Sequence, residues 1–279
     1  MNGSKTGRTV RTVVALAVAA LWLFPVYWMV SSAFMSTAVL RQLTPHFFPE
    51  RFTTANFRGA VADGAFFRAL VMSVTITLVV VAVCLVFAFL AAVAISRFRF
   101  RGRTSLVLAL LLIQMLPAEG LFIAQYKMIS SVGLLNTVLG VTIIYVAAVV
   151  PFTVWMLRGF VAGVPAELEE AAMVDGLSRF QAFLRITFPL LAPGLVASGV
   201  FAFLQAWNEF TVAVVLLPAE KAQTLPLWLR GFVQASATRE TDWGQVMAAS
   251  AIVAIPVIVF FVVVQGRMTS GLVGGAVKG

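Results

Sequence analysis

The few acidic residues of this chain are concentrated in one segment. Only 11 of the 279 residues are Asp or Glu, and four of them lie close together: Glu167, Glu169, Glu170 and Asp175. Carboxylates in the first turns of a short helix are favoured by the helix dipole, and an exposed carboxylate can bind a cation of another molecule. The three glutamates therefore predict the start of a short helix.

Residues that usually perform catalysis or bind metals are scarce. The chain has one cysteine, Cys84, and one histidine, His46, so an intrachain disulfide is excluded and a transition-metal site is not expected. We interpret Cys84 as a packed apolar residue and His46 as a solvated loop residue. The ATPase phosphate loop, Gly-x-x-x-x-Gly-Lys-Ser/Thr, does not occur in the chain. We therefore expect no catalytic residue, no metal, no cofactor bound by this chain and no enzymatic activity.

A second set of residues interrupts apolar stretches, where polar groups are costly and tend to face a cavity or a partner. The polar residues of this set are Gln114, Glu119, Gln205, Asn208 and Glu209, and we include their aromatic neighbour Trp207. Helical spacing predicts one shared face for Gln205, Asn208 and Glu209. Pro117 and Gly120 around Glu119 indicate a kinked or shortened helix end. We expect the set to line a translocation path, and hydrogen bonding between helices at a subunit interface is the open alternative.

The scaffold that positions these residues has the composition of a membrane protein. Hydrophobic residues make up 61% and charged residues 11% of the chain, and the mean hydropathy is +1.00. Soluble domains are nearer to about 45–50% apolar and about 25% charged. Soluble enzymes, nucleic-acid-binding modules and disulfide scaffolds are thereby excluded.

Six stretches are long enough to cross a bilayer, which takes roughly 20 helical residues. These nearly charge-free stretches are 13–34, 69–95, 105–126, 137–157, 189–217 and 245–266. The predicted fold class is an all-α polytopic membrane protein with six transmembrane helices in a domain covering 13–267. The first stretch is too long for the apolar core of a signal peptide, so we expect it to be retained.

The basic residues predict the orientation. The chain carries a formal charge of +9, and Arg97–Arg103 alone holds four arginines without an acid. Lys and Arg in short loops mark the cytoplasmic side. If the chain has six spans, this run lies on the same side of the membrane as both ends of the chain. We therefore expect a cytoplasmic N-terminus, 1–12, and a cytoplasmic tail, 268–279.

The loop 158–188, between the fourth and fifth predicted spans, predicts a pair of short amphipathic helices. The first begins near Pro165, Gly176 permits a left-handed turn, and Ser178 can cap the second. Such a pair could simply anchor the loop at the membrane surface. The spacing of its residues favours another interpretation.

Glu170-Ala171-Ala172, Gly176 and Ile186-x-x-Pro189 follow a known spacing. They resemble the E-A-A-x3-G-x9-I-x-L-P signature of permease subunits of ATP-binding-cassette (ABC) importers, with Phe188 in place of leucine. The resemblance extends along the chain to the carbohydrate-uptake branch, above all to the second permease of maltose-type systems. The segments that carry it are 24–28, 133–137, 151–155, 207–210, 242–244 and 271–279.

The resemblance implies that the bent loop couples this chain to a cytoplasmic ATPase, with Glu170 and Gly176 at the interface. The coupling residues implied are Glu167, Glu170, Ala171, Ala172, Asp175, Gly176, Ile186 and Pro189. It further implies a bacterial inner-membrane permease for a sugar or oligosaccharide. Its partners would be a second homologous permease, two copies of an ATPase that uses ATP, an external sugar-binding protein and membrane lipid, with no nucleic acid.

Two other functions stay open. Permeases with this loop also carry other small solutes, such as amino acids or polyamines. A self-sufficient secondary transporter would need an internal repeat and ionisable groups near the midplane, and we find no convincing repeat. A membrane-embedded enzyme lacks a credible nucleophile and base.

Overall fold

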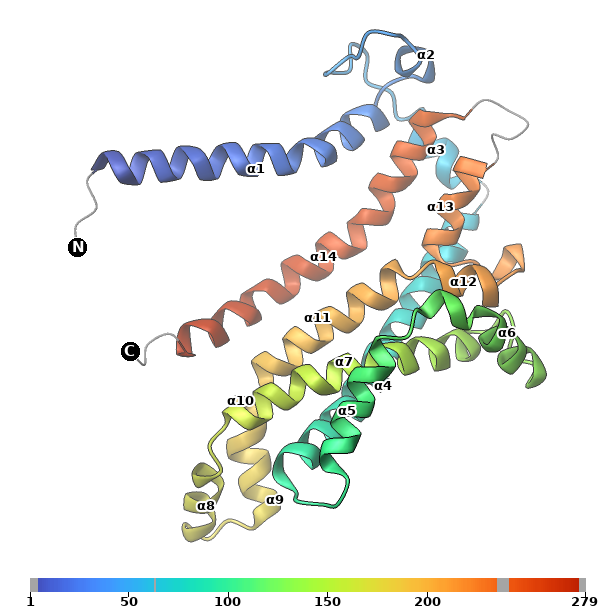
Figure 1. The fold of residues 1–279 in the computed structure, drawn as a ribbon. Helices are drawn as coiled ribbons and strands as arrows, with labels where there is room; N and C mark the ends of the chain where they lie inside the picture. Colours follow the sequence, from blue (N-terminus) through green and yellow to red (C-terminus); the bar gives the residue numbers. More distant parts are fainter. Residues whose placement is uncertain (1–4, 63, 235–240, 276–279) are drawn as a thin grey trace. The chain divides into compact units, whose positions relative to one another are not determined.

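The computed structural model describes residues 5–62, 64–234 and 241–275, and all regular structure in these ranges is helical (Figure 1). The all-α fold class is thereby confirmed. Residues 1–4 of the expected N-terminal segment and 276–279 of the expected tail lie outside the described ranges. The chain divides into two compact units.

The first unit comprises Met1–Phe66 and Trp228–Ile255. Its helices are α1 (Lys5–Ala33), α2 (Thr37–Leu40) and α3 (Ala55–Val61), with most of α13 (Leu225–Gln234) and the start of α14 (Trp243–Gly275). The buried side chain of Asn56 ties the end of α1 to α3. Its amide donates to the carbonyl of Ala33 at 2.9 Å, which the end of the helix otherwise leaves unpaired, and to that of Met35, just beyond the helix, at 2.7 Å.

The second unit comprises Phe67–Leu227 and Pro256–Gly279 and contains the remaining elements. The longer helices are α4 (Ala65–Arg97), α5 (Arg103–Gln114), α6 (Phe122–Ser131), α7 (Val138–Gly163) and α11 (Ala192–Asn208). The shorter elements are η1 (Ala118–Leu121), α8 (Glu167–Val174), α9 (Arg179–Ala182), η2 (Phe183–Thr187), α10 (Phe188–Leu190), α12 (Thr211–Leu216) and η3 (Glu220–Ala222).

Helix α7 is the centre of the second unit and packs against both α5 and α11 (Figure 1). Ala88 and Ala92 of α4 are fully buried in a cluster with Leu157 of α7. Small residues allow helices to approach closely where lipid gives no hydrophobic driving force for association. The α8–α9 segment lies at one end of this unit, and α6 and α12 lie at the other (Figure 1).

The lengths of the helices support most of the predicted spans. Four helices among the described residues are long and apolar enough to cross a membrane: 7–33, 65–97, 138–163 and 243–266. A fifth span results if Arg179–Leu190 and Ala192–Asn208, which are bent by 62°, count as one. The predicted count of six therefore stays a prediction.

The predicted third span, 105–126, is divided in the structure. Helix α5 ends at Gln114, and its 12 residues cover only about 18 Å. Pro117 adopts an extended backbone and has no N–H to continue a helix. The chain resumes as η1 and then α6, in agreement with the interruption expected around Pro117 and Gly120.

Two predicted boundaries also shift. Helix α7 runs to Gly163, six residues beyond the predicted span end at 157, and α14 runs to Gly275, within the expected tail. The apolar composition of a segment predicts only the part of a helix that lies within the apolar layer of the membrane. The backbone hydrogen bonds of the helix continue past that layer, so the helix is longer than the predicted span.

Candidate functional site

Within the predicted loop 158–188, the residues that follow the end of α7 at Gly163 form the bent helix pair that the sequence predicts. Helix α8 ends in a Schellman motif, in which Gly176 N–H donates to Met173 and Leu177 N–H donates to Ala172, both at 3.1 Å. Gly176 has φ 94°, which confirms the left-handed turn. Ser178 and Gln181 then form a capping box that starts α9.

A glycine is favoured at position 176 because of its left-handed backbone conformation, not because neighbouring atoms leave no room for a side chain. A Cβ placed on this glycine would meet no atom within 4 Å. The left-handed conformation alone costs an ordinary L-residue roughly 1–2 kcal/mol. A substitution at Gly176 therefore tests the bend itself.

The predicted coupling residues lie mainly on the surface of this pair. Those that are exposed are Glu167, Glu170, Ala171, Asp175 and Pro189, whereas Ile186 is half-buried and Ala172 is buried. Apolar side chains are exposed beside them: Val174 is 88% and Phe180 70% exposed. Exposed apolar groups rimmed by polar ones are typical of a surface that contacts another protein or the membrane.

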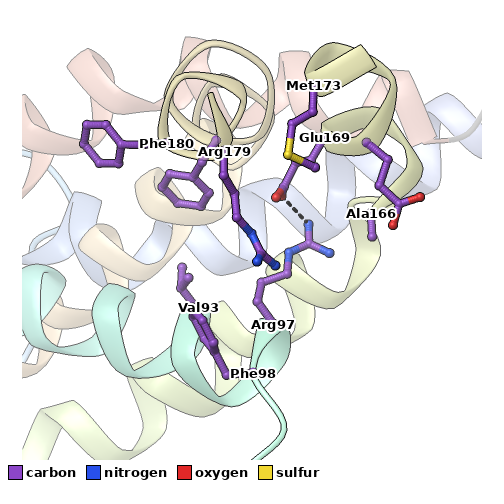
Figure 2. Close-up of a pocket in the computed structure, with 10 residues that line it drawn as sticks. Val93, Arg97, Phe98, Ala166, Glu169, Met173, Arg179 and Phe180 are labelled. Carbon is purple, nitrogen blue, oxygen red and sulfur yellow. Dashed lines mark ion pairs between the residues drawn. The ribbon is translucent and has the colours of Figure 1, made fainter. Parts of the chain in front are cut away.

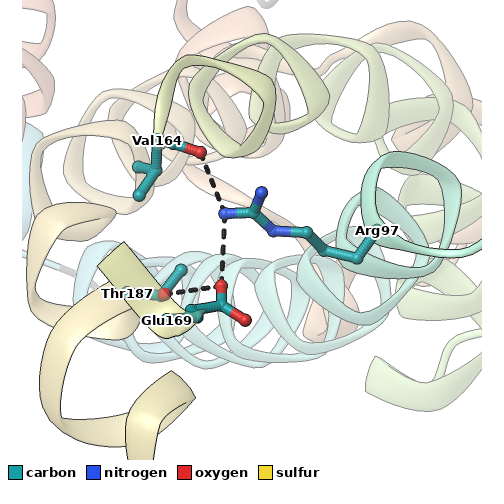
Figure 3. A network of polar contacts seen from close by, with 4 residues as sticks. All are labelled: Arg97, Val164, Glu169 and Thr187. Atoms are coloured by element: carbon teal, nitrogen blue, oxygen red, sulfur yellow. Dashed lines mark hydrogen bonds and ion pairs between the residues drawn. The ribbon is translucent and has the colours of Figure 1, made fainter. Parts of the chain in front are cut away.

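One acid of the cluster turns inward. Glu169 Oε1 lies 3.2 Å from Nη2 of Arg97 and accepts a hydrogen bond from Thr187 Oγ1 at 2.7 Å (Figure 3). The same guanidinium nitrogen donates to the carbonyl of Val164 at 3.0 Å. We refer to Arg97, Val164, Glu169 and Thr187 as the Arg97 network.

The sequence does not predict this network. The basic run that contains Arg97 predicts only the orientation in the membrane, and the resemblance implies a coupling role for Glu167 and Glu170 but not for Glu169. The 100° step between successive helical residues does separate Glu169 from Glu170. Which of the two faces inward depends on how α8 is rotated against α4, and no local pattern reveals that rotation.

A cavity of about 630 Å³ opens beside the network, between the end of α4 and the α8–α9 pair (Figure 2). Its apolar lining includes Val93, Met173 and Phe180, and Arg179 points into the space between them. Phe89 of α4 holds the α9 side of the loop, with ring centroids 6.1 Å from Phe183 and 5.6 Å from Phe188. The helix pair is therefore attached to α4 by aromatic packing and by the Arg97 network.

Glu209, predicted to line a translocation path, caps a helix in the structure. Its carboxylate accepts from the backbone N–H groups of Val212, at 2.8 Å, and Ala213, at 3.1 Å, at the start of α12. The hydroxyl of Tyr145 donates to the same carboxylate at 2.5 Å. Because α11 ends at Asn208 and Glu209 is extended, the predicted face shared with Gln205 and Asn208 is wrong for Glu209.

The other residues of the predicted path differ in exposure. Gln114, Gln205 and Asn208 are exposed, and the amide of Asn208 donates to the carbonyl of Leu204 at 2.9 Å. Trp207 is only 3% exposed, and its ring stacks on Phe203 with centroids 5.6 Å apart. The side chain of Glu119 lies outside the described part of the structure.

Residues 51–270 match the family described as binding-protein-dependent transport system inner membrane component. The diacetylchitobiose uptake system permease protein DasC of Streptomyces coelicolor is 40% identical over 279 residues, which cover 100% of both chains. The trehalose transport system permease protein SugB of Mycobacterium tuberculosis is 32% identical, over 92% of this chain and 93% of SugB.

The fold is similar to a chain of a solved bacterial ABC transporter that is involved in import of the acidic polysaccharide alginate. The TM-score is 0.77 at 25% identity, over 95% of this chain and 99% of that chain.

Proposed function

Since the chain belongs to the family of binding-protein-dependent transport system inner membrane components and is an ABC importer permease, we propose that its solute is a sugar or oligosaccharide. The proposal is supported by the diacetylchitobiose and trehalose permeases, which are similar to this chain along nearly their whole length. The family is described as an inner membrane component of a transport system that depends on a binding protein.

The partners follow from the same proposal. This chain forms half of the translocation pathway, and a second related permease forms the other half. Two copies of a cytoplasmic ATPase use ATP below them, while this chain binds no cofactor of its own. The complex lies in the bacterial inner membrane with both termini of this chain in the cytoplasm.

One observation carries the coupling role, namely the bend at Gly176 between two short helices on which Glu170 and Phe180 are exposed. A short, rigid, bent segment that fits a cleft of the ATPase transmits the closure of the ATPases to the transmembrane helices. Apolar side chains give contact area, and the carboxylate of Glu170 binds a cation of the partner.

We expect Gly176→Val to lower uptake of labelled sugar in proteoliposomes by roughly tenfold while ATP hydrolysis continues. The strain of about 1–2 kcal/mol at a left-handed position corresponds to about that factor in the population of the bent form. Glu170→Lys should separate hydrolysis from uptake in the same way, because it reverses the charge offered to the partner.

Gly133→Val is the matched control. Gly133 also has a positive φ, of 70°, and open space around it, but it lies between α6 and α7. Its substitution should leave the ratio of ATP hydrolysed to sugar transported unchanged. Wild-type uptake by Gly176→Val would refute the coupling role, and uptake of amino acids or polyamines in preference to sugars would refute the solute class.

A further inference from the structure

Helix α8 is joined to the rest of the chain by two non-helical connections. Val164, after the end of α7, has an extended backbone, and Gly176, after the end of α8, has a left-handed one. At each connection the run of helical hydrogen bonds is interrupted, so the helical backbone of α8 continues neither into α7 nor into α9. Side chains that hold α8 to the transmembrane helices are therefore needed to transmit a force applied to α8.

The Arg97 network supplies that attachment. It joins four elements, because Arg97 is the last residue of α4, Val164 follows α7, Glu169 lies in the first turn of α8 and Thr187 ends η2 (Figure 3). One guanidinium nitrogen and one carboxylate oxygen each serve two partners. Loss of either charged group therefore breaks more than one contact.

The ion pair of Arg97 and Glu169 is largely enclosed by the protein and so differs from an ion pair on the surface. The side chains of Arg97 and Glu169 are 17% and 13% exposed, and Thr187 is fully buried. Exposed pairs contribute little because water screens them, whereas removal of one partner of an enclosed pair leaves an uncompensated charge. Glu170, on the neighbouring face of α8, is exposed.

We propose that Arg97 and Glu169 are a positioning pair for energy coupling, which fixes α8 to α4 so that a displacement of α8 by the ATPase moves the transmembrane helices. The two adjacent acids thus have different roles: Glu169 holds α8 to its own subunit, and Glu170 faces the partner. The inference rests on the proposed function, since a transporter without an ATPase partner has no use for such an attachment.

The first test measures the attachment itself in the assembled complex. Backbone amide hydrogen exchange of residues 167–174 reports local opening of α8. We expect exchange about tenfold faster in Arg97→Met and in Glu169→Gln than in the wild type. The control is Arg99→Met, which removes an exposed arginine two residues away and should leave exchange unchanged.

The second test asks whether the side chains act as one unit. The double variant Arg97→Met/Glu169→Gln should exchange no faster than the faster of the two single variants, because each already breaks the shared contact. Thr187→Val should accelerate exchange, and Thr187→Ser, which keeps the hydroxyl, should not. Additive effects in the double variant would overturn the proposed pair.

The third test measures coupling as the ratio of ATP hydrolysed to sugar transported in proteoliposomes. A purely structural role would lower both rates together, whereas a positioning role raises the ratio, to at least about threefold that of Arg99→Met. An unchanged ratio in variants whose α8 exchange is faster would overturn the proposal. If the wild-type complex transports no sugar at all, the proposed function fails, while the exchange measurements still report on the attachment.

Discussion

Glu169 and Glu170 are neighbours in sequence, but their carboxylates meet different surroundings. Glu169 is enclosed beside Arg97 and Thr187, whereas Glu170 is exposed and lines the cavity. A helix turns by about 100° at each residue, so adjacent side chains necessarily face different directions. The function of each acid is therefore decided by the direction in which it points and not by its residue type.

Glu209 shows the same distinction within the predicted span 189–217. A charged residue inside a membrane segment indicates a functional site by default. Here the carboxylate accepts the two backbone N–H groups at the start of α12 and the hydroxyl of Tyr145. Capping of α12 accounts for the presence of this charge without any contact to a solute.

We expect Glu209→Gln to lower the thermal stability of the complex, at a cost of about 1–3 kcal/mol, because one amide oxygen replaces two carboxylate oxygens that serve three donors. Tyr145→Phe should cost less, about 1 kcal/mol, since it removes one donor and leaves the cap intact. Thermal unfolding of the purified complex provides the measurement. A Glu209→Gln complex with wild-type stability and an altered solute preference would favour a direct contact with the solute.

At the scale of the elements, the approach of α11 to α7 depends on Gly194. A Cβ on Gly194 would lie 2.5 Å from Cγ of Phe160 and 2.8 Å from its Cβ, far inside contact distance. Gly199 on the same helix has room, with the nearest atom, Cδ1 of Leu85, at 3.4 Å. The two glycines thus allow a matched comparison of packing between helices.

We expect Gly194→Ala to destabilise the complex by about 1–3 kcal/mol, the usual cost of overpacking. For a chain of this size that corresponds to a lower unfolding temperature by roughly 2–4 °C per kcal/mol. Gly199→Ala should have no such effect. Equal unfolding temperatures for the two variants would show that α7 and α11 do not approach as closely as described.

At the scale of the whole molecule, the orientation in the membrane can be tested with the single native cysteine in place. Cys84 is fully buried and its thiol donates to Thr153 Oγ1 at 3.4 Å, so it should not react with a membrane-impermeant maleimide. Val174 is 88% exposed in the bent helix pair, and Phe48 is 73% exposed between the first two predicted spans, 13–34 and 69–95, which the predicted orientation places on the outer side of the membrane. Cysteines at these two positions therefore report the two sides of the membrane.

We expect Val174→Cys to be labelled only from the cytoplasmic side, measured in inside-out vesicles from cells without the ATPase. Phe48→Cys should be labelled only in intact spheroplasts. The opposite pattern would reverse the orientation that the basic residues predict, and labelling of the wild type would contradict the burial of Cys84.

The sequence by itself determined the class of protein and the local form of the bent helix pair. The apolar composition could not be buried in a soluble fold, so it identified a membrane protein and most of its spans. The bend at Gly176 and the cap at Ser178 involve hydrogen bonds between residues no more than five positions apart. Short-range geometry of this kind is encoded by the residues that form it.

Only the tertiary structure decided which polar residues meet. Arg97 contacts Val164 from a position 67 residues away, and Tyr145 contacts Glu209 from 64 residues away. Such contacts depend on the rotation and axial position of packed helices, and a helix of apolar residues fits its neighbours in several rotations. The sequence therefore located the acidic cluster, and the packing of α4, α7 and α8 selected Glu169 as the acid that turns inward.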